Sequence, residues 1–354
     1  MGSTEYGSEF DWDSSAALLR REAGELPVED AKYYRSGRDA LKALARALPT
    51  SRVLLPALSC DSMAVPFALN GWEVVYYKLR PDLRADTEDV LSKLTNGAVL
   101  IYMRYFGLPS FSDEFLSELK ARRSDVTLVE DRTQDIVVPR EDSFVPDAMI
   151  ASLRKWTALP EGGVLKTTLN VERGEYSPVF GQLRRAVMEE KSLYLKTWDQ
   201  ELKRAFMARL HGADALLDAE REPCAVSPEY SELLRRVDFG KIYSLRLENV
   251  SRLKARLAPL KAAGKLDFLT DAPELSTLYF PVLLKDRDKI WRRMIDNKIY
   301  CAVIWPIPKA AEGACPVTEY INRHMLGIIC DQRCGADDMD FIADTLEGAL
   351  KGQV

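Results

Sequence analysis

Between residues 34 and 165, short apolar runs alternate with amphipathic segments. The apolar runs are nearly free of charge, which is typical of strands buried on both faces. Apolar residues recur every three to four positions in the segments between them, which is typical of helices. We therefore predict strands over 52–56, 72–77, 98–103, 127–130, 148–152 and 163–166, and helices over 39–47, 62–70, 86–94 and 112–122. This alternation indicates an α/β fold with a mostly parallel sheet covered on both faces.

After residue 178 the pattern changes to long, charge-rich helical segments. We predict helix over 182–219 and again over 230–260. A strand, helix and strand follow, and then a third strand and a closing helix: 278–284, 286–297, 300–304, 325–330 and 337–349. This predicts three parts: an N-terminal arm over 1–29, a large α/β domain over 30–240 and a small α+β domain over 241–354.

Charge and hydropathy exclude several classes of function. The chain has 354 residues and a formal net charge of −5, with a pI near 5.4. Nucleic-acid binding usually requires a basic face, so we expect no nucleic-acid partner. The sequence has no apolar run of membrane-spanning length and no signal-peptide core, so we expect a cytoplasmic protein without a membrane partner.

Cysteine and histidine usage limits the chemistry further. The six cysteines are scattered without a C-x-x-C spacing, and Cys330 and Cys334 lack a second ligand pair nearby. We expect reduced thiols and no metal site. The two histidines, His211 and His324, leave little scope for a catalytic triad or a histidine base. A mechanism whose acid-base group is a lysine suits this composition better.

Three segments carry candidate chemistry. Ser152 and Lys155 follow one predicted strand, Asp131 follows another, and Ser36-Gly37-Arg38 opens the first predicted helix. Pyridoxal phosphate (PLP) chemistry needs a lysine for a Schiff base and a carboxylate for the pyridine nitrogen, and helix N-termini bind phosphate. Burial beside Arg154 would lower the pKa of Lys155, as attack on a carbonyl requires. Each segment also has a plainer interpretation, as a surface turn, a carboxylate N-cap or an ordinary helix cap.

Read in order, these segments resemble the DegT/DnrJ/EryC1/StrS family of PLP-dependent sugar aminotransferases, which have the type I fold of such enzymes. The resemblance rests on residues 36–41, 53–57, 105–107 and 130–134, and on Lys155 followed by Glu161-Gly162-Gly163. It implies a seven-stranded type of sheet between helices, a smaller C-terminal domain and a homodimer. It is strongest over roughly residues 30–170, and the chain looks like a divergent subgroup.

The resemblance also implies roles for individual residues. Lys155 would form the Schiff base and move the proton, Asp131 would pair with the pyridinium nitrogen, and Gln134 would reach the phenolic oxygen. Phosphate would be bound by Ser36, Gly37 and Arg38. Lysine at position 155 favours transamination, because related sugar dehydratases carry histidine there.

Two positions depart from the family. Ile150 stands where a phosphate-binding serine is usual, so we expect Ser152 to substitute for it. No aromatic residue follows Ser59, so the ring face would be covered by Cys60, by Asp61 or by no side chain; Cys60 is the candidate. These departures leave the sugar substrate open.

Four further residues are candidates for substrate contact, each with a structural alternative. Trp305 would wall the site or belong to the core. Arg333 would bind a substrate carboxylate or phosphate, or form a surface salt bridge. Tyr34 and Tyr105 adjoin proposed site segments.

The resulting hypothesis is a PLP-dependent aminotransferase of a biosynthetic pathway. It would move an amino group from an amino acid, expected to be glutamate, to a keto acceptor such as a nucleotide-linked keto sugar or a natural-product intermediate. Two alternatives stay open: a PLP enzyme that catalyses elimination or carbon–carbon bond chemistry, and a catalytically degenerate binding protein on the same scaffold.

Overall fold

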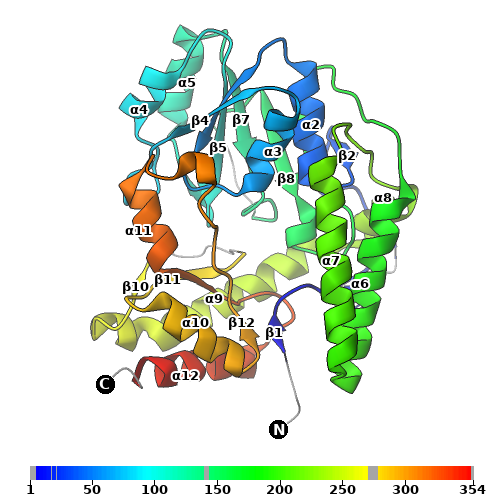
Figure 1. Cartoon of the computed structure of the whole chain (residues 1–354), viewed down its shortest axis with the longest axis vertical. Helices are drawn as coiled ribbons and strands as arrows, with labels where there is room; N and C mark the ends of the chain where they lie inside the picture. The colour runs from blue at the N-terminus through cyan, green and yellow to red at the C-terminus, as the bar shows by residue number, and fades with distance from the viewer. Residues whose placement is uncertain (1–4, 17, 21, 139–142, 270–277, 352–354) are drawn as a thin grey trace.

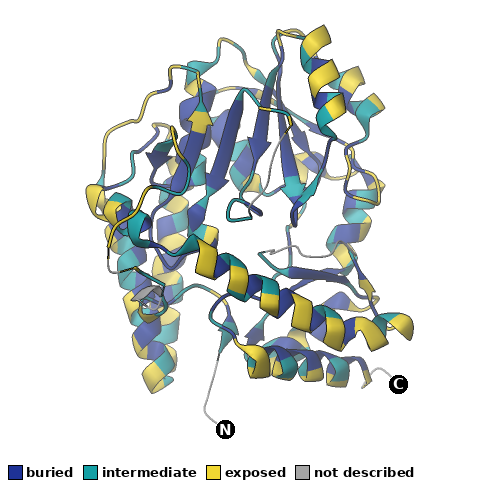
Figure 2. Cartoon of the chain, turned by 180° about the vertical axis from the view of Figure 1, so that it is seen from behind, coloured by how far each residue is buried: buried dark blue, intermediate teal, exposed yellow. Residues whose placement is uncertain are grey.

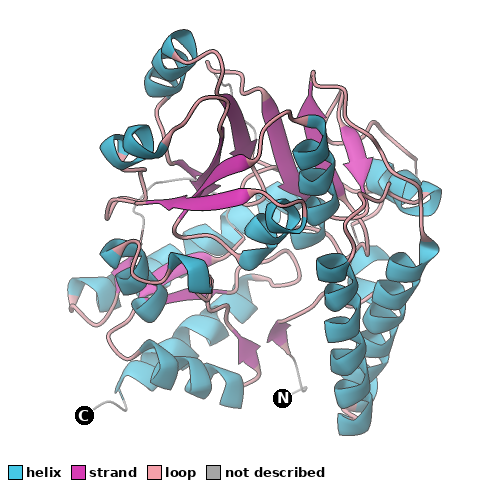
Figure 3. Ribbon diagram, turned by 45° about the horizontal axis from the view of Figure 1, so that its top comes forward, coloured by secondary structure: helices cyan, strands magenta, loops and turns pink. Residues whose placement is uncertain are grey.

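A large sheet organises the first half of the computed structural model, which describes residues 5–16, 18–20, 22–138, 143–269 and 278–351. The strand order is β2-β9-β8-β7-β5-β3-β4, and β6 (Leu108–Pro109) pairs with β5. Neighbours from β8 to β4 are parallel, whereas β9 runs antiparallel to β8 and β2. The predicted α/β class with a mostly parallel sheet is confirmed (Figure 3). The strands are β2 (Lys32–Tyr34), β3 (Arg52–Pro56), β4 (Glu73–Tyr77), β5 (Val99–Tyr105), β7 (Thr127–Asp131), β8 (Ala148–Ser152) and β9 (Gly163–Thr167).

Helices follow the strands much as the pattern predicted. They are α2 (Gly37–Ala47), α3 (Asp61–Leu69), α4 (Thr87–Lys93) and α5 (Asp113–Arg122). Their apolar faces and the strands form one large core, in which Val53, Leu54, Leu100 and Ile101 have no exposed surface. Figure 2 shows the strands of the sheet as buried, with helices around them whose outer faces are exposed. This buried sheet makes the carboxyl ends of its parallel strands a rigid platform.

The predicted helix over 182–219 is wrong as a single element. It is two antiparallel helices, α6 (Pro178–Thr197) and α7 (Gln200–Ala219), which pack side by side (Figure 1). The break falls at Trp198, which adopts a left-handed conformation with φ 57°. Asp199 then caps α7 by accepting hydrogen bonds from Glu201 N and Leu202 N. Likewise, the predicted segment over 230–260 divides into α8 (Pro228–Arg236) and α9 (Phe239–Ala262), with Asp238 as the N-cap of α9.

A second core forms in the C-terminal third. A small antiparallel sheet, β10-β11-β13, packs with α9, α10 (Arg287–Asp296) and α12 (Ala336–Lys351). Its strands are β10 (Asp267–Phe268), β11 (Phe280–Leu283) and β13 (Met325–Ile328). The α+β character of this part agrees with the sequence pattern, while a domain boundary near residue 240 stays a prediction.

The predicted strand over 300–304 is largely wrong. Only β12 (Ile299–Tyr300) pairs there, in parallel with β1 (Tyr6–Gly7), and Ala302 adds one isolated bridge to Gly327. Pro306 and Pro308 lack backbone N–H groups and disfavour a continuing ladder. The chain instead runs to the large core, where Ile304 is buried, and then forms α11 (Pro316–His324), which the pattern did not predict.

Residues 6–16, within the predicted N-terminal arm, form a segment that we call the strap. After β1, a four-residue helix α1 (Asp13–Ala16) follows. Trp12 N donates to Met188 O at 3.0 Å, and the Arg185 guanidinium lies 3.3 Å from the centre of the Trp12 ring. The strap therefore links β12, in the C-terminal part, to α6.

A close approach of two backbones fixes the start of α2 against β9. A Cβ built on Gly163 would lie 2.0 Å from Ser36 O, so no larger residue fits without moving one of the two segments. A Cβ on Gly37 would lie 3.4 Å from the Cβ of Ser152, in ordinary contact. These contacts bring the α2 N-terminus beside the end of β8.

Gly163→Ala is therefore expected to destabilise the fold by about 3 kcal/mol or more through overpacking. Gly212→Ala is the matched control, because it lies in α7 with open space around its Cβ and should stabilise by about 1 kcal/mol. Urea unfolding of the two variants checks the difference; equal stabilities would contradict the close approach.

Candidate functional site

Lys155 ends a single turn of 3-10 helix, Leu153–Lys155, directly after β8. Its side chain is exposed, yet enough protein surrounds the amine to lower the pKa of Lys155 by burial, and the positive charge of Arg154 lowers it further. Both influences have the direction expected from the sequence. A lysine that reaches solvent and is readily deprotonated is suited to nucleophilic attack.

The Glu161-Gly162-Gly163 turn contacts residues 153–156, which we call the lysine loop. Leu153 N donates to Gly162 O at 2.7 Å, and Gly162 N donates to Arg35 O at 3.2 Å. Gly162 has φ 146°, a conformation that L side chains rarely adopt. Glu161 is buried, and Ser227 N donates to its Oε2 at 2.7 Å. The turn therefore holds the loop from the side of β9.

Trp156 ties the other side of the loop to the C-terminal part. Its Nε1 donates to Thr133 O, and Gln332 Nε2 donates to its carbonyl, both at 2.7 Å. Arg246, on α9, donates from Nε to Gln332 Oε1 at 2.8 Å and lies over the Trp156 ring. Sequence reasoning did not identify Arg246 or Gln332 as supports of the lysine loop.

Asp131 is the last residue of β7, one strand from β8. Its carboxylate accepts a hydrogen bond from Thr133 N at 2.8 Å, and no ion pair to it is found within the described part of the chain. Burial raises the pKa of Asp131 to about 6. A buried carboxyl group without a cation is well placed to receive a cationic ligand atom.

Gln134 and Tyr105 lie near Asp131 and are buried. The side-chain oxygen of Gln134 accepts from Phe106 N at 2.7 Å, so its amide nitrogen is the group left to donate. The Tyr105 hydroxyl donates to Leu58 O at 2.6 Å. Tyr105 therefore supports the segment before Cys60, and its contact with a substrate stays a prediction.

Cys60 stands just before α3. Its Sγ lies 2.8 Å from Ser62 Oγ. Burial raises the pKa of the Cys60 thiol, while the charges of Lys155 and Asp131 act on it in opposite directions. The charges of Lys155 and Asp131 therefore both act on the Cys60 thiol.

The α2 N-terminus presents backbone N–H groups beside Ser152. Ser36 caps the helix, with its Oγ accepting from Asp39 N at 3.2 Å and donating to Asp39 Oδ2 at 2.6 Å. Its hydroxyl is thus engaged. The first-turn N–H groups of Gly37 and Arg38 have no acceptor within the helix. Together with Ser152 they form a surface suited to an anion.

Arg38 and Arg154 add positive charge beside the N-terminus of α2 and Ser152. The Arg38 guanidinium pairs with Asp218 at 3.1 Å and with Asp214 at 3.8 Å. Arg154 reaches the same Asp214 only at 4.0 Å, and its Nε has no hydrogen-bond partner among the described residues. Burial and then the charge of Arg184 lower the pKa of Arg154 to about 9. This positive charge is not fully compensated, which favours binding of an anion.

The strap also places the Glu9 carboxylate where the charges of Arg184, Lys155 and Arg154 act on it. Arg184, on α6 and 4% exposed, donates from Nη2 to Glu9 Oε2 at 2.6 Å. Burial opposes ionisation of Glu9, but the charges of Arg184, Lys155 and Arg154 outweigh it and bring its pKa to about 2. Sequence reasoning found neither Glu9 nor Arg184, because no local spacing links them to Lys155.

The other candidate substrate residues have structural partners. Tyr34 is fully buried at the end of β2, and its hydroxyl donates to Glu172 O at 2.8 Å. Trp305 packs partly buried against the large core, and its carbonyl accepts from Asn322. Arg333 forms a salt bridge to Asp331 at 2.7 Å and donates to Glu9 O at 3.0 Å. Substrate contact by any of these residues stays a prediction.

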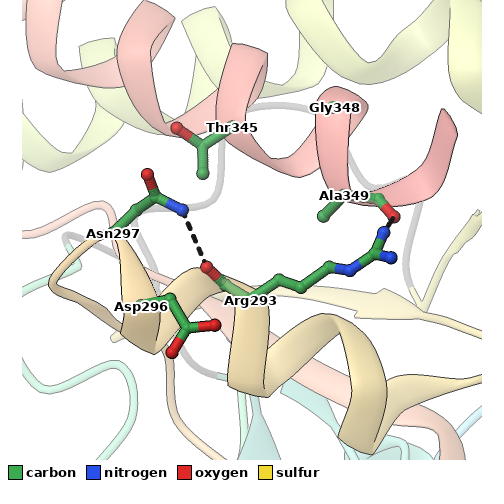
Figure 4. A pocket seen from close by; sticks show the side chains of 6 residues that line it. All are labelled: Arg293, Asp296, Asn297, Thr345, Gly348 and Ala349. Atoms are coloured by element: carbon green, nitrogen blue, oxygen red, sulfur yellow. Dashed lines mark hydrogen bonds between the residues drawn. The ribbon is translucent and has the colours of Figure 1, made fainter. Parts of the chain in front are cut away.

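One depression lies elsewhere, between α10 and α12, and includes no candidate residue (Figure 4). It is lined by Arg293, Asp296, Asn297, Thr345, Gly348 and Ala349. In the described ranges, no three His, Cys, Asp or Glu side chains are arranged to hold a metal ion, and no helix is long and apolar enough to cross a membrane.

The raised pKa of Asp131 predicts a pH-dependent stability change. The pKa of Asp131 is higher in the folded protein than the ordinary value of 3.8. Its ionisation therefore destabilises the fold as the pH rises above 3.8, and the full loss of stability is reached above about pH 6. Asp131→Asn removes this charge and should stabilise the ligand-free protein by about 2 kcal/mol near pH 8, with no gain near pH 4. Urea unfolding at both values checks this, and an equal gain at both would contradict the burial of an ionised Asp131.

Comparison with solved structures identifies the architecture. An aminotransferase named for DegT, DnrJ, EryC1 and StrS from Brucella abortus has a TM-score of 0.62 and 15% identity over 91% of this chain and 86% of its own. The aminotransferase TlmJ from Streptoalloteichus hindustanus has a TM-score of 0.66 and 15% identity over 99% of both chains. NtdA from Bacillus subtilis, solved with bound cofactor PMP, has a TM-score of 0.65 and 14% identity over 91% and 73%.

Sequence comparison alone gives no such likeness. No family model matches the chain, and no curated protein matches its sequence. The fold of this chain is therefore that of the DegT-type aminotransferases, at sequence identities that leave its activity to be argued from its own residues.

Proposed function

We propose that this chain is a PLP-dependent aminotransferase. The observation that carries the proposal is that Asp131 ends β7, that Lys155 follows the adjacent strand β8, and that the charges of both act on the Cys60 thiol. The pKa of each is shifted towards the neutral form. Perturbed groups of this kind mark functional sites. Bound PLP supplies an electrophilic aldehyde and a cationic ring that accepts the electron pair released at the substrate Cα.

Lys155 would bond to the cofactor aldehyde and, once released by the amino donor, move a proton at the substrate Cα. Both tasks need a neutral amine near physiological pH, and burial with the neighbouring Arg154 charge provides it. Trp156 and the Glu161–Gly163 turn hold the loop from two sides, so the backbone that carries the amine is held by hydrogen bonds.

Asp131 would pair with the protonated ring nitrogen. A cation beside it would stabilise the ionised carboxylate and return its pKa to the usual range. The amide nitrogen of Gln134 would donate to the phenolic oxygen, since the carboxamide oxygen is already held by Phe106 N. Cys60 would lie against one ring face.

The α2 N-terminus would bind the phosphate, with N–H groups of Gly37 and Arg38 and the hydroxyl of Ser152. Ser36 would act as the helix cap, because its hydroxyl already serves Asp39. Arg38 would contribute charge, and Arg154 would add a guanidinium that the sequence hypothesis did not assign to this group. The incompletely compensated charge of Arg154 supports this assignment.

The amino donor would be an amino acid, with glutamate expected from the resemblance, and the acceptor a keto compound, such as a nucleotide-linked keto sugar. We also propose the domain division near residue 240, a homodimer and a cytoplasmic location. The homodimer is supported by the general observation that two-fold homodimers are the commonest oligomers of soluble proteins.

Replacing the lysine tests the proposal directly. Wild-type protein reconstituted with PLP should show a visible absorbance band that an amino donor bleaches, and Lys155→Ala should lack the band. Lys166→Ala, an exposed lysine on β9, is the matched control and should retain it. An unchanged band in Lys155→Ala would refute the proposal, and a band that no common donor bleaches would argue for a non-transaminating PLP enzyme.

A further inference from the structure

The backbone of Glu9 holds this residue in position within the strap. Its carboxylate takes no part in these contacts. Glu9 O accepts hydrogen bonds from Arg333 Nη1 at 3.0 Å and from Lys191 Nζ. Arg333 also donates to Ser8 O at 3.3 Å and lies over the Phe10 ring. Neither contact involves the Glu9 side chain.

Anchors on both sides fix the course of the strap. Before Glu9, β1 pairs with β12, and a Cβ on Gly7 would lie 2.6 Å from Ile329 Cδ1. Gly7 and Ser8 have φ values of 77° and 63°, which turn the chain sharply. After Glu9, Trp12 and Asp13 attach to α6 through Met188 O and Ser192 Oγ. Figure 1 shows β1 beside β12, near the long α6–α7 pair.

Arg184 orients the Glu9 carboxylate and uses one of its oxygens. The guanidinium donates to Oε2, whereas Oε1 is not buried and makes no hydrogen bond within the described part of the chain. The Glu9 side chain is 33% exposed, while Arg184 is 4% exposed. One carboxylate oxygen is therefore fixed and one is open to a ligand. The Arg154 guanidinium lies 5.0 Å from the centre of the Phe180 ring, and Phe180 precedes Arg184 by about one turn of α6, so the pair of Arg184 and Glu9 lies on the side of α6 that the lysine loop contacts.

We propose that Glu9 is a specificity-determining residue of the Lys155 site, whose free oxygen accepts a hydrogen bond from a neutral donor group, such as a hydroxyl, of the keto acceptor. Arg184 is the positioning residue. The same oxygen repels a carboxylate at this place, so on this inference a neutral side chain such as that of glutamine suits the site better than the glutamate that the resemblance suggests. This inference rests on the proposed aminotransferase function and specifies the acceptor as hydroxyl-bearing where it meets the strap.

Glu9→Gln reverses the polarity of the free group. Arg184 donates, so it retains the carboxamide oxygen and leaves the amide NH2, a donor, facing the ligand. L-Glutamine and L-glutamate are isosteric probes, because the side chain of glutamine ends in a neutral amide and that of glutamate in a carboxylate of the same shape. The ratio of their kcat/KM values in the bleaching half-reaction should shift towards glutamate by about tenfold or more in Glu9→Gln.

Asp13→Asn is the control on the same strap, because Asp13 forms an exposed ion pair with Lys196 at 2.7 Å. It should leave the ratio unchanged. An unchanged ratio in Glu9→Gln, or an equal shift in Asp13→Asn, would overturn the proposal.

A second readout needs no cofactor. Acetic anhydride labelling of Lys155 in the cofactor-free protein, followed by peptide mass spectrometry, reports the neutral amine as a function of pH. Loss of the Glu9 charge should move the labelling profile of Lys155 to lower pH, because a carboxylate stabilises the ammonium form. A shift without PLP binding would support Glu9 at the site while the aminotransferase proposal failed. An unshifted profile would overturn the placement of Glu9 beside Lys155.

Discussion

The whole site depends on one electrostatic constraint: Lys155 lies among fixed positive charges, and no carboxylate of the described residues forms an ion pair with its amine. Arg154 precedes it in the chain, and Arg184 acts on Arg154 in turn. Glu9 and Asp214 offset this charge only in part, because Glu9 is shared with Arg184 and Asp214 lies 4.0 Å from Arg154. A lysine in this environment deprotonates readily, and an anionic group bound beside it gains stabilisation.

This constraint is maintained by rigid backbone contacts. The approach of Ser36 to Gly163 places the α2 N-terminus next to β8, and the Gly162 carbonyl holds the lysine loop. On the other side, Gln332 and Arg246 connect Trp156 to the second core. The lysine loop is thus braced by both halves of the molecule, so movement of one half against the other would be felt at Lys155.

The sequence pattern predicted the large sheet well, because unbroken apolar strands and periodic helices encode it locally. Lys155 and Asp131 could also be named as candidates, since one follows such a strand and the other ends one. Glu9 and Arg184 were not, because their pairing joins segments 175 positions apart. Trp198 was missed as a break because a left-handed residue inside a periodic helical segment gives no local signal. Packing of the strap and of α6 is a tertiary property that no local pattern contains.

Borohydride reduction of the PLP-reconstituted protein, followed by peptide mass spectrometry, tests the central claim most directly, because it locates the covalent bond. The account predicts a phosphopyridoxyl group on the peptide that contains Lys155, at about one group per chain. Modification spread over exposed lysines, or none at Lys155, would contradict it.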